Sequence, residues 1–267
     1  MGNRTILVTN DDGFESPGVH ALCESLSRLA DVTLVAPTIE KSACGHSLTL
    51  TRPLNFVEMA PHRYKLDDGT PSDCVFLALK KIFGDKKPDL VVSGINIGAN
   101  MGEDITYSGT ASAAMEAVLQ GIPAVAVSQV YDLDSEDIPS FELASEVIFR
   151  IVGAIFDGGY PLGDREFLNI NVPPCGIDGY RGTKITYAGH REYGNEAYVH
   201  YNPRGKEYYW IGLPLPGWRP RDGHSERGLL SDFEAIEDGF VSITPIELDM
   251  TAYGRLESLE KFLERVE

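Results

Sequence analysis

Two adjacent carboxylates, Asp11 and Asp12, follow a short apolar run in the stretch ILVTNDDG at residues 6–13. The end of a core strand is a costly place for two like charges. Two carboxylates with neutral oxygens from Ser and Asn suit a hard divalent cation such as Mg²⁺, Mn²⁺ or Ca²⁺. Histidines and cysteines are scattered, so no zinc-type cluster is indicated. A plain turn is the alternative, because DDG is ordinary turn chemistry, but the position after a strand favours a site.

A second polar stretch, SGINIGANMGEDITYSGT at residues 93–110, predicts an anion site. Asn96 and Asn100 are short amide side chains on a glycine-rich backbone, and SGT opens a predicted helix. A helix N-terminus offers N–H groups and positive partial charge to a phosphate, and the hydroxyls of Ser108 and Thr110 would add donors. Ser108 as a simple N-cap is the alternative. The stretch lacks G-x-G-x-x-G and is weak evidence for NAD binding.

The elements that must position these residues alternate between strand and helix. Four almost continuously apolar runs are typical of strands covered on both faces. They lie at residues 5–10, 32–37, 89–94 and 124–129, and helical patterns separate them at 16–30, 70–84 and 108–121. Ser16 and Thr70 are predicted N-caps, each followed by proline. The pattern predicts an α/β fold with a parallel sheet and helices on both faces. The loops after parallel strands share one crevice, where a cation site beside an anion site indicates phosphoryl chemistry.

The second half of the chain changes character. A helix is predicted at 141–156 and strands at 167–173 and 240–246. Residues 176–230 are rich in Gly, Pro, Tyr, Trp and Arg, which predicts an extended β-arm that packs on another surface, such as a second subunit. The C-terminal residues form an amphipathic helix with the apolar stripe Leu256, Leu259, Phe262, Leu263 and Val266. We therefore divide the chain into a catalytic core (1–175), an oligomerisation arm (176–235), and a returning strand with a C-terminal helix (236–267).

The composition is that of a globular protein of 267 residues, of which 43% are hydrophobic. Forty acidic against 23 basic residues give a formal net charge of −17, which argues against a surface that coats a nucleic acid polymer. No apolar run approaches the ~20 residues of a membrane span, and the N-terminal run is too short for a signal peptide. We expect a cytoplasmic protein with no membrane partner. Cys23 and Cys74 are expected in the core, and Cys44 in an accessible loop.

Seven blocks of the sequence resemble, in order, the SurE (survival protein E) family of metal-dependent 5′/3′-nucleotidases. The blocks are ILVTNDDG, VAP…KSACGHS, GTPSDCV, VSGINIGANMG…YSGTASAAMEA, LNINVP, YYWIG and VSITPI, from about residue 5 to 247. The resemblance implies a Rossmann-like core, with a β-hairpin and C-terminal helix that build homodimers or homotetramers by exchange between subunits. It implies hydrolysis of nucleoside 5′- and 3′-monophosphates, with short polyphosphate as a further candidate substrate.

Residue by residue, the resemblance implies one divalent metal ion per subunit, Mg²⁺ or Mn²⁺ with Ca²⁺ and Co²⁺ as alternatives. The implied ligands are Asp11, Asp12, Ser42 and Asn96. The implied phosphate contacts are Asn100, Ser108, Gly109 and Thr110. In the catalytic step, either aspartate is a candidate to orient or deprotonate the attacking water, and His46 would either protonate the leaving oxygen or order its loop. The chain departs from the family pattern at Ala99, which stands where the family usually has Pro, and at Cys44, which replaces Thr.

Two other interpretations compete with this one. A haloacid-dehalogenase-type phosphatase needs an acid two residues after its nucleophile, where this chain has Gly13. A non-catalytic, receiver-like module that binds phosphate and metal also has acids at the end of its first strand. Such a module is a single domain of about 120 residues, within the usual domain range and less than half this length. The receiver-like module remains the alternative function, and it would release no nucleoside.

Overall fold

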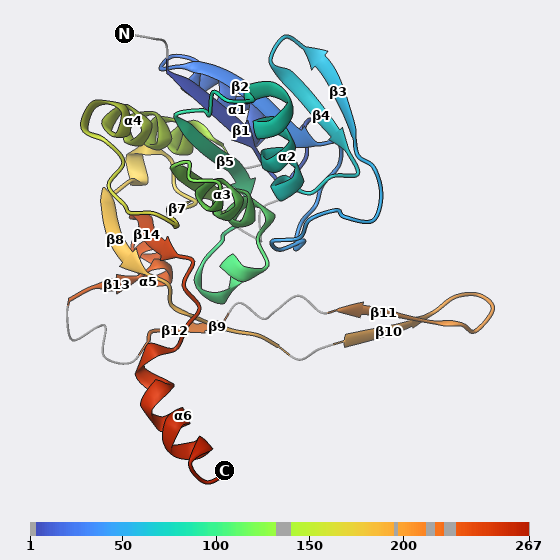
Figure 1. The fold of residues 1–267 in the computed structure, drawn as a ribbon, viewed down its shortest axis with the longest axis vertical. Helices are drawn as coiled ribbons and strands as arrows, with labels where there is room; N and C mark the ends of the chain where they lie inside the picture. The colour runs from blue at the N-terminus through green and yellow to red at the C-terminus, as the bar shows by residue number, and fades with distance from the viewer. Residues whose placement is uncertain (1–3, 132–139, 195–196, 212–216, 222–227, 267) are drawn as a thin grey trace.

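A central sheet organises the computed structural model, which describes residues 4–131, 140–194, 197–211, 217–221 and 228–266 (Figure 1). Within these residues the sheet has ten strands in the order β13-β8-β14-β7-β6-β5-β1-β2-β4-β3. Neighbouring strands are parallel except in the pairs β7–β14 and β3–β4. The strands are β1 Thr5–Thr9, β2 Asp31–Pro37, β3 Asn55–Ala60, β4 Arg63–Asp67, β5 Leu90–Ile97, β6 Ala124–Gln129, β7 Glu166–Val172, β8 Thr183–Tyr187, β13 Leu230–Ser231 and β14 Val241–Glu247. The predicted, mostly parallel α/β sheet is confirmed.

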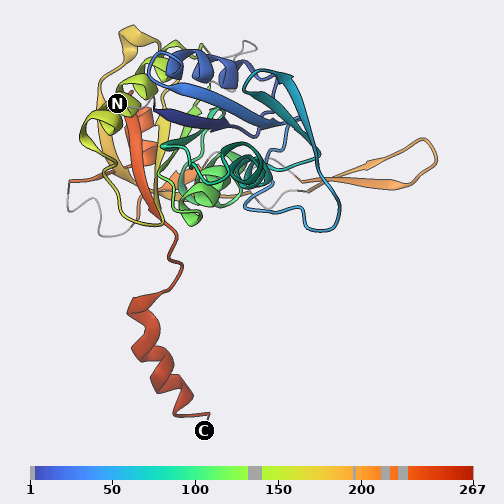
Figure 2. The same ribbon diagram turned by 45° about the horizontal axis from the view of Figure 1, so that its top comes forward.

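Helices cover both faces of the sheet, as the alternation predicted (Figures 1 and 2). The helices are α1 Pro17–Leu26, α2 Pro71–Ala78 with a π-helical continuation Leu79–Phe83, α3 Gly109–Leu119, α4 Glu142–Gly158, α5 Asp232–Glu237 and α6 Leu256–Leu263. α1 and α4 pack on the face that holds Ile6, and α2 and α3 pack on the face that holds Leu7. Successive strand residues point to opposite faces, so one continuously apolar strand serves both layers. No helix among the described residues is long and apolar enough to cross a membrane.

The N-caps show how closely the helix starts follow the sequence. Thr70 accepts the N–H of Asp73, and the Asp73 carboxylate accepts the N–H of Thr70, which forms a capping box. Ser108 accepts the N–H of Ala111 (3.0 Å) and caps α3. Ser16 occupies the N-cap position of α1, but its side chain makes no capping hydrogen bond. The caps at Thr70 and Ser108 are confirmed. For Ser16, only its place at the start of α1 is confirmed.

A β-hairpin that no sequence pattern predicted extends the sheet beyond β2. β4 pairs parallel with β2, and β3 pairs antiparallel with β4 at the edge. The two sequences, NFVEMA and RYKLD, mix charged with apolar residues, and most of β3 is exposed. An edge strand covered on one face lacks the continuous apolar run of a core strand, so the apolar pattern could not mark it.

β5 is irregular just before the candidate residue Asn96. Its pairing with β6 shifts register between Ser93 and Asn96. Gly94 lies in the shift with a φ of +134°, and a Cβ there would lie 2.2 Å from the carbonyl oxygen of Val127. Only glycine meets both conditions. A bulge bends a strand and redirects the side chains after it, so Gly94 helps to set the direction in which the Asn96 side chain points.

Part of the predicted arm, residues 176–235, joins the central sheet, because β8 pairs with β14 and β13 pairs with β8. Beyond β8, β9 (His190–Glu192) pairs with β12 (Gly217–Arg219), and β10 (Ala197–Tyr201) pairs with β11 (Glu207–Ile211). Figure 1 shows β10 and β11 projecting away from the body. Exposed aromatic side chains on this hairpin are Tyr198, Tyr201, Tyr208, Tyr209 and Trp210. The projecting segment is therefore shorter than the predicted range.

The C-terminal helix α6 stands away from the body (Figure 2). Four residues of the predicted apolar stripe lie on α6 and are exposed, with Leu259 and Phe262 exposing 54% and 56% of their surface, whereas Val266 lies beyond the end of the helix. The cost of leaving such a stripe in water is a reason to expect a partner surface.

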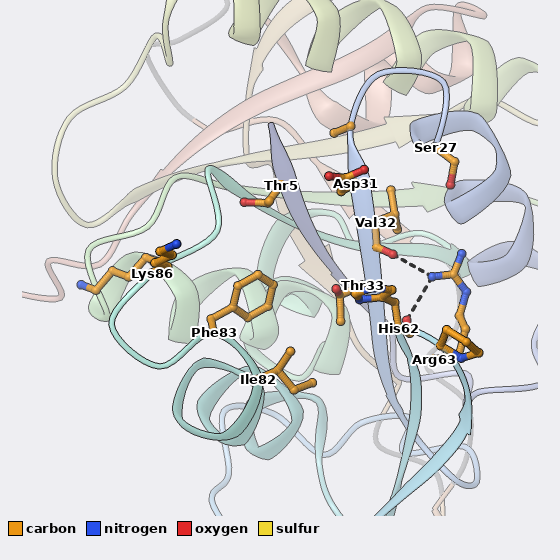
Figure 3. A pocket seen from close by; sticks show the side chains of 13 residues that line it. Thr5, Ser27, Asp31, Val32, Thr33, His62, Arg63, Ile82, Phe83 and Lys86 are labelled. Carbon is orange, nitrogen blue, oxygen red and sulfur yellow. Dashed lines mark hydrogen bonds between the residues drawn. The ribbon is translucent and has the colours of Figure 1, made fainter. Parts of the chain in front are cut away.

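A cavity of about 940 Å³ lies at the amino ends of the strands, whereas the acid pair lies at their carboxyl ends. It is lined by residues at the starts of β1, β2 and β4, among them Thr5, Asp31 and Arg63. Figure 3 shows the Arg63 guanidinium donating to the backbone carbonyls of Val32 (2.9 Å) and His62 (3.1 Å). The cavity is thus separate from the crevice in which the candidate residues meet.

Candidate active site

The acid pair lies just beyond the carboxyl end of β1, which runs between β2 and β5 in the sheet. Asp11 is buried, with 4% of its surface exposed, and Asp12 is partly buried. The loop that carries them is held by Asn10, whose side-chain Nδ2 donates to the Gly13 carbonyl (2.9 Å). The acids therefore occupy the crevice where ligands bind in parallel sheets.

The N-terminus of α3 points at Asp11. The Thr110 hydroxyl donates to Asp11 Oδ1. The backbone N–H groups of Gly109 and Thr110 lie near the same carboxylate and act to lower its pKa. Burial raises the pKa of Asp11, and the Thr110 hydroxyl and the backbone donors lower it in part. The anion at this helix N-terminus is thus a carboxylate of the protein itself, and the helix fixes its orientation.

Asp12 is held by β5, because its Oδ2 accepts the N–H of Ile97 (3.1 Å). Burial raises the pKa of Asp12 to about 7, with smaller contributions from the charges of Asp11 and Glu40. Among the described residues, no Lys or Arg side chain forms an ion pair with Asp11 or Asp12. Two neighbouring acids without a basic partner call for a proton or a bound cation.

The loop after β2 brings Ser42 to the acid pair. The Lys41 N–H donates to the Asp11 carbonyl oxygen (2.7 Å), which places the next residue, Ser42, at the same edge. The Ser42 hydroxyl donates to Glu40 Oε1 (2.6 Å). Glu40 is a third carboxylate near Asp12, and no sequence pattern marked it as a site residue. In the sequence, the one feature that could have marked Glu40 is its position two residues before the candidate ligand Ser42.

His46 contacts α3 rather than the acid pair. Its Nε2 lies 3.1 Å from Glu116 Oε2, and this hydrogen bond is the main cause that lowers the pKa of Glu116. Such a contact is what a loop-ordering role requires. Cys44 is half-buried, and burial, followed by the charge of Asp11, raises its pKa to about 11, so the thiol is protonated at neutral pH. The predicted burial of Cys23 and Cys74 is confirmed.

Asn96 lies near the end of β5, and Asn100 follows that strand in the next loop. Asn96 Nδ2 donates to the Gly98 carbonyl (2.9 Å), which leaves its amide oxygen as the atom suited to a cation. Asn100 is 7% exposed and belongs to a buried polar network. Its Nδ2 donates to Ser128 Oγ (2.8 Å) and its backbone N–H donates to Asn171 Oδ1 (2.9 Å). Asn100 is therefore tied to β6 and β7, and one of its amide protons is already in use.

The chemistry of these groups fits a hard divalent cation. The buried Oδ1 of Asn10 accepts no hydrogen bond from any described residue, and it adjoins the acid pair in the chain. Among all the residues that the structure describes, no three His, Cys, Asp or Glu side chains are grouped so that they could hold a metal ion by themselves. A cation here would rely on two carboxylates, neutral oxygens and water, which is the ligand set of Mg²⁺ or Mn²⁺.

Comparison with known proteins decides the family. The sequence model of the family described as Survival protein SurE matches residues 6–195.

The chain belongs to the SurE family.

Relatives of SurE type match almost the whole chain. The protein named 5′-nucleotidase SurE in Sulfurovum sp. (strain NBC37-1) is 60% identical over 265 residues, which cover 98% of each chain. The protein of the same name in Aliarcobacter butzleri (strain RM4018) is 53% identical over 262 residues, 97% of this chain and 98% of that one. The crystal structure of the SurE protein from Aquifex aeolicus superposes with a TM-score of 0.81 at 42% identity and covers 97% of this chain and 99% of that chain. The SurE resemblance and the α/β fold are both confirmed.

The pKa of Asp12 predicts how pH affects the protein without its cation. An unfolded aspartate has a pKa near 3.9, so between that pH and about 7 the folded chain keeps a proton that the unfolded chain releases. The free energy of unfolding therefore falls as pH rises through this window. Asp12→Asn should remove the part of this fall that Asp12 causes and stabilise the chelated protein at pH 8 by at most about 4 kcal/mol.

Urea unfolding of the chelated protein at pH 4.5 and pH 8 would measure this effect. Asp157→Asn is the matched control, because Asp157 is an exposed acid near the end of α4. An equal effect of Asp12→Asn at both pH values would contradict the raised pKa.

Proposed function

We propose that this protein is a divalent-metal-dependent phosphatase that hydrolyses nucleoside 5′- and 3′-monophosphates to nucleoside and phosphate. The observation that supports it most is the acid pair, which has no basic partner among the described residues. Asp11 is buried at the N-terminus of α3, and Asp12 is partly buried beside it. The names of the relatives point the same way, because 5′-nucleotidase SurE of Sulfurovum is 60% identical over nearly the full length. Short polyphosphate is a further candidate substrate.

The proposed metal ligands are Asp11, Asp12, Ser42 and Asn96, with one ion per subunit. When bound, a divalent ion would supply Lewis-acid stabilisation of charge on the phosphate. The chain's own contribution is to hold the ligands in place: α3 orients Asp11, and the Ile97 N–H orients Asp12. The Ser42 hydroxyl donates its proton to Glu40, so the lone pairs of its oxygen stay available to a cation. Mg²⁺ or Mn²⁺ fits hard oxygen ligands best here, with Ca²⁺ and Co²⁺ as alternatives.

The proposed phosphate contacts are Asn100, Ser108, Gly109 and Thr110. The Thr110 hydroxyl already donates to Asp11, and the Ser108 hydroxyl caps α3, so both side chains are held in a fixed turn beside the proposed phosphate site. Asp11 or Asp12 would orient or deprotonate the attacking water. His46 orders its loop through Glu116 in this proposal, and protonation of the leaving oxygen by His46 is the alternative role.

Phosphate release is the direct test of this function. After chelation and removal of the chelator, we expect no release from 5′-AMP or 3′-AMP, and release from both when Mg²⁺ or Mn²⁺ is added back. Folded protein that binds the cation but releases no phosphate from either nucleotide would favour the receiver-like binding module instead. Comparison of the two nucleotides also ranks the 5′ and 3′ positions.

We further propose that residues 1–175 form the catalytic core, that the arm within 176–235 and the C-terminal segment 236–267 build a homodimer or homotetramer, and that the protein is cytoplasmic. The exposed stripe on α6 supports the assembly, and four free cysteines suit a reducing compartment.

We expect Leu259→Asp with Phe262→Asp to lower the mass measured by light scattering, because both side chains would bury apolar surface against a partner in this assembly. Ser258→Asp on the same helix is the control. A monomeric wild type would contradict the assembly, and cell fractionation tests the location.

A further inference from the structure

A short 3₁₀ helix, η2 (Gly102–Thr106), joins the two groups of proposed phosphate contacts. Asn100 precedes it and Ser108 follows it, so the position of η2 sets the distance between them. The backbone carbonyl of Asp104 accepts the N–H groups of Tyr107 (3.0 Å) and Ser108 (3.1 Å). Asp104 is therefore linked directly to the residue that caps α3.

The side chain of Asp104 is held by Arg191, which lies in β9 at the root of the arm. Arg191 Nε and Nη2 each lie 2.7 Å from Asp104 Oδ2, and the hydroxyl of Tyr193 donates to Asp104 Oδ1 (2.9 Å). The side chains of Arg191 and Asp104 are only 13% and 22% exposed. A charge-assisted pair that is largely shielded from water holds geometry better than a surface ion pair does.

Other contacts also connect η2 to the root of the arm. Glu103 accepts the backbone N–H of Arg191 (2.6 Å) and lies 2.7 Å from His190 Nδ1. The buried carboxylate of Asp232 accepts the N–H of Gly102 (2.8 Å) and, through its other oxygen, the N–H of Gly189 (2.9 Å). Three carboxylates therefore fasten η2 to the root of the arm and to α5.

The segment that follows η2 also contacts the loop on the metal side of the crevice. The carbonyl of Tyr107 accepts the N–H of Gly45 (2.9 Å), in the loop that carries Ser42 and His46. The ring of Tyr107 meets the ring of Tyr193 edge to face, with centroids 6.2 Å apart. A displacement of η2 would thus reach both halves of the crevice.

We propose that Arg191 is a positioning residue, which acts from the root of the arm through Asp104 to hold η2 and the start of α3 in the geometry that catalysis needs. This inference rests on the proposed function. Arg191 is fixed on its other side by Phe233, since its guanidinium lies 4.5 Å from the ring centroid. A lysine would place one ammonium where the planar guanidinium offers two nitrogens to the carboxylate, so Lys is not an equivalent residue here.

Arg191→Lys and Arg191→Met should each lower kcat/KM for 5′-AMP by about 100-fold, mostly through kcat, because a misplacement of about 1 Å costs that much. The matched control is Arg219→Lys. Arg219 lies in β12 beside β9, and its pair with Glu192 is long (3.9 Å) and exposed. We expect the control to stay within about twofold of wild type, as exposed pairs contribute little.

A double-mutant cycle tests whether Arg191 acts through Asp104. Arg191→Met combined with Asp104→Asn should lose no more activity than the more damaged single variant, because both remove the same contact. Independent effects that multiply would overturn the proposal. So would an Arg191→Lys enzyme that keeps kcat/KM within twofold of wild type.

Hydrogen exchange separates this inference from the proposed function. In Arg191→Lys, amides of residues 99–110 should exchange faster than in wild type, while Arg219→Lys should leave them unchanged. A wild type that releases no phosphate would remove the proposed function, and the exchange result would still report whether Arg191 holds η2. Unchanged exchange across residues 99–110 in folded Arg191→Lys would overturn the positioning role.

Discussion

Asp12→Ala should abolish metal-dependent phosphate release while the chain keeps its fold. Asp12 is a proposed metal ligand, and a bound cation contributes several kcal/mol of transition-state stabilisation, so the loss should be at least about 1000-fold in kcat. The fold should survive because the side chain stands in a loop, and among the described residues its one hydrogen bond is to the Ile97 N–H. Asp12 is partly buried and has no basic partner among the described residues, so its removal also relieves repulsion with Asp11.

The measurement is the rate of phosphate release from 5′-AMP at saturating Mg²⁺ or Mn²⁺, together with thermal unfolding of the same sample. Asp157→Ala, which removes an exposed acid near the end of α4, should retain wild-type activity and serves as the control. An Asp12→Ala enzyme with activity near wild type would show that the acid pair is not the catalytic centre. An unfolded variant would be replaced by Asp12→Asn, which keeps the shape of the side chain.

Gly109→Ala should lower kcat/KM by about 100-fold, because it would push apart the groups that orient Asp11. A Cβ at this position would lie 2.7 Å from Asp11 Cβ, 2.8 Å from Asp11 Oδ2 and 3.0 Å from Cys44 Sγ. The backbone of Gly109 does not have a positive φ, so alanine fits the helix itself. The cost therefore comes from the close approach of α3 to the side chains of Asp11 and Cys44.

Gly153→Ala in α4 is the matched control for this prediction. A Cβ there would meet nothing within 4 Å, so alanine should leave activity unchanged and stabilise the helix by up to about 1 kcal/mol. Steady-state kinetics and thermal unfolding of both variants measure the contrast. Gly109→Ala activity equal to that of Gly153→Ala would show that the contact between α3 and Asp11 has no role in catalysis.

The strands and helices of the core were predictable because their signals are local. A strand covered on both faces must be apolar throughout, and a helix start needs a cap, so β1, β2, β5 and β6 and the cap at Thr70 stand out in the sequence. The hairpin β3–β4 did not, because an edge strand is only partly covered. The extent of the projecting arm was also missed, since β8 enters the sheet by pairing with a strand more than 50 residues later.

The sequence by itself determined the family, the α/β class and the chemical character of the crevice, because these depend on residue types in order along the chain. Only the tertiary structure decided what each side chain touches. It directed the start of α3 at Asp11, placed Glu40 near Asp12, and joined Asp104 to Arg191 across 87 positions of sequence. Contacts between residues far apart in sequence depend on how the sheet and its loops pack, and no local pattern encodes that packing.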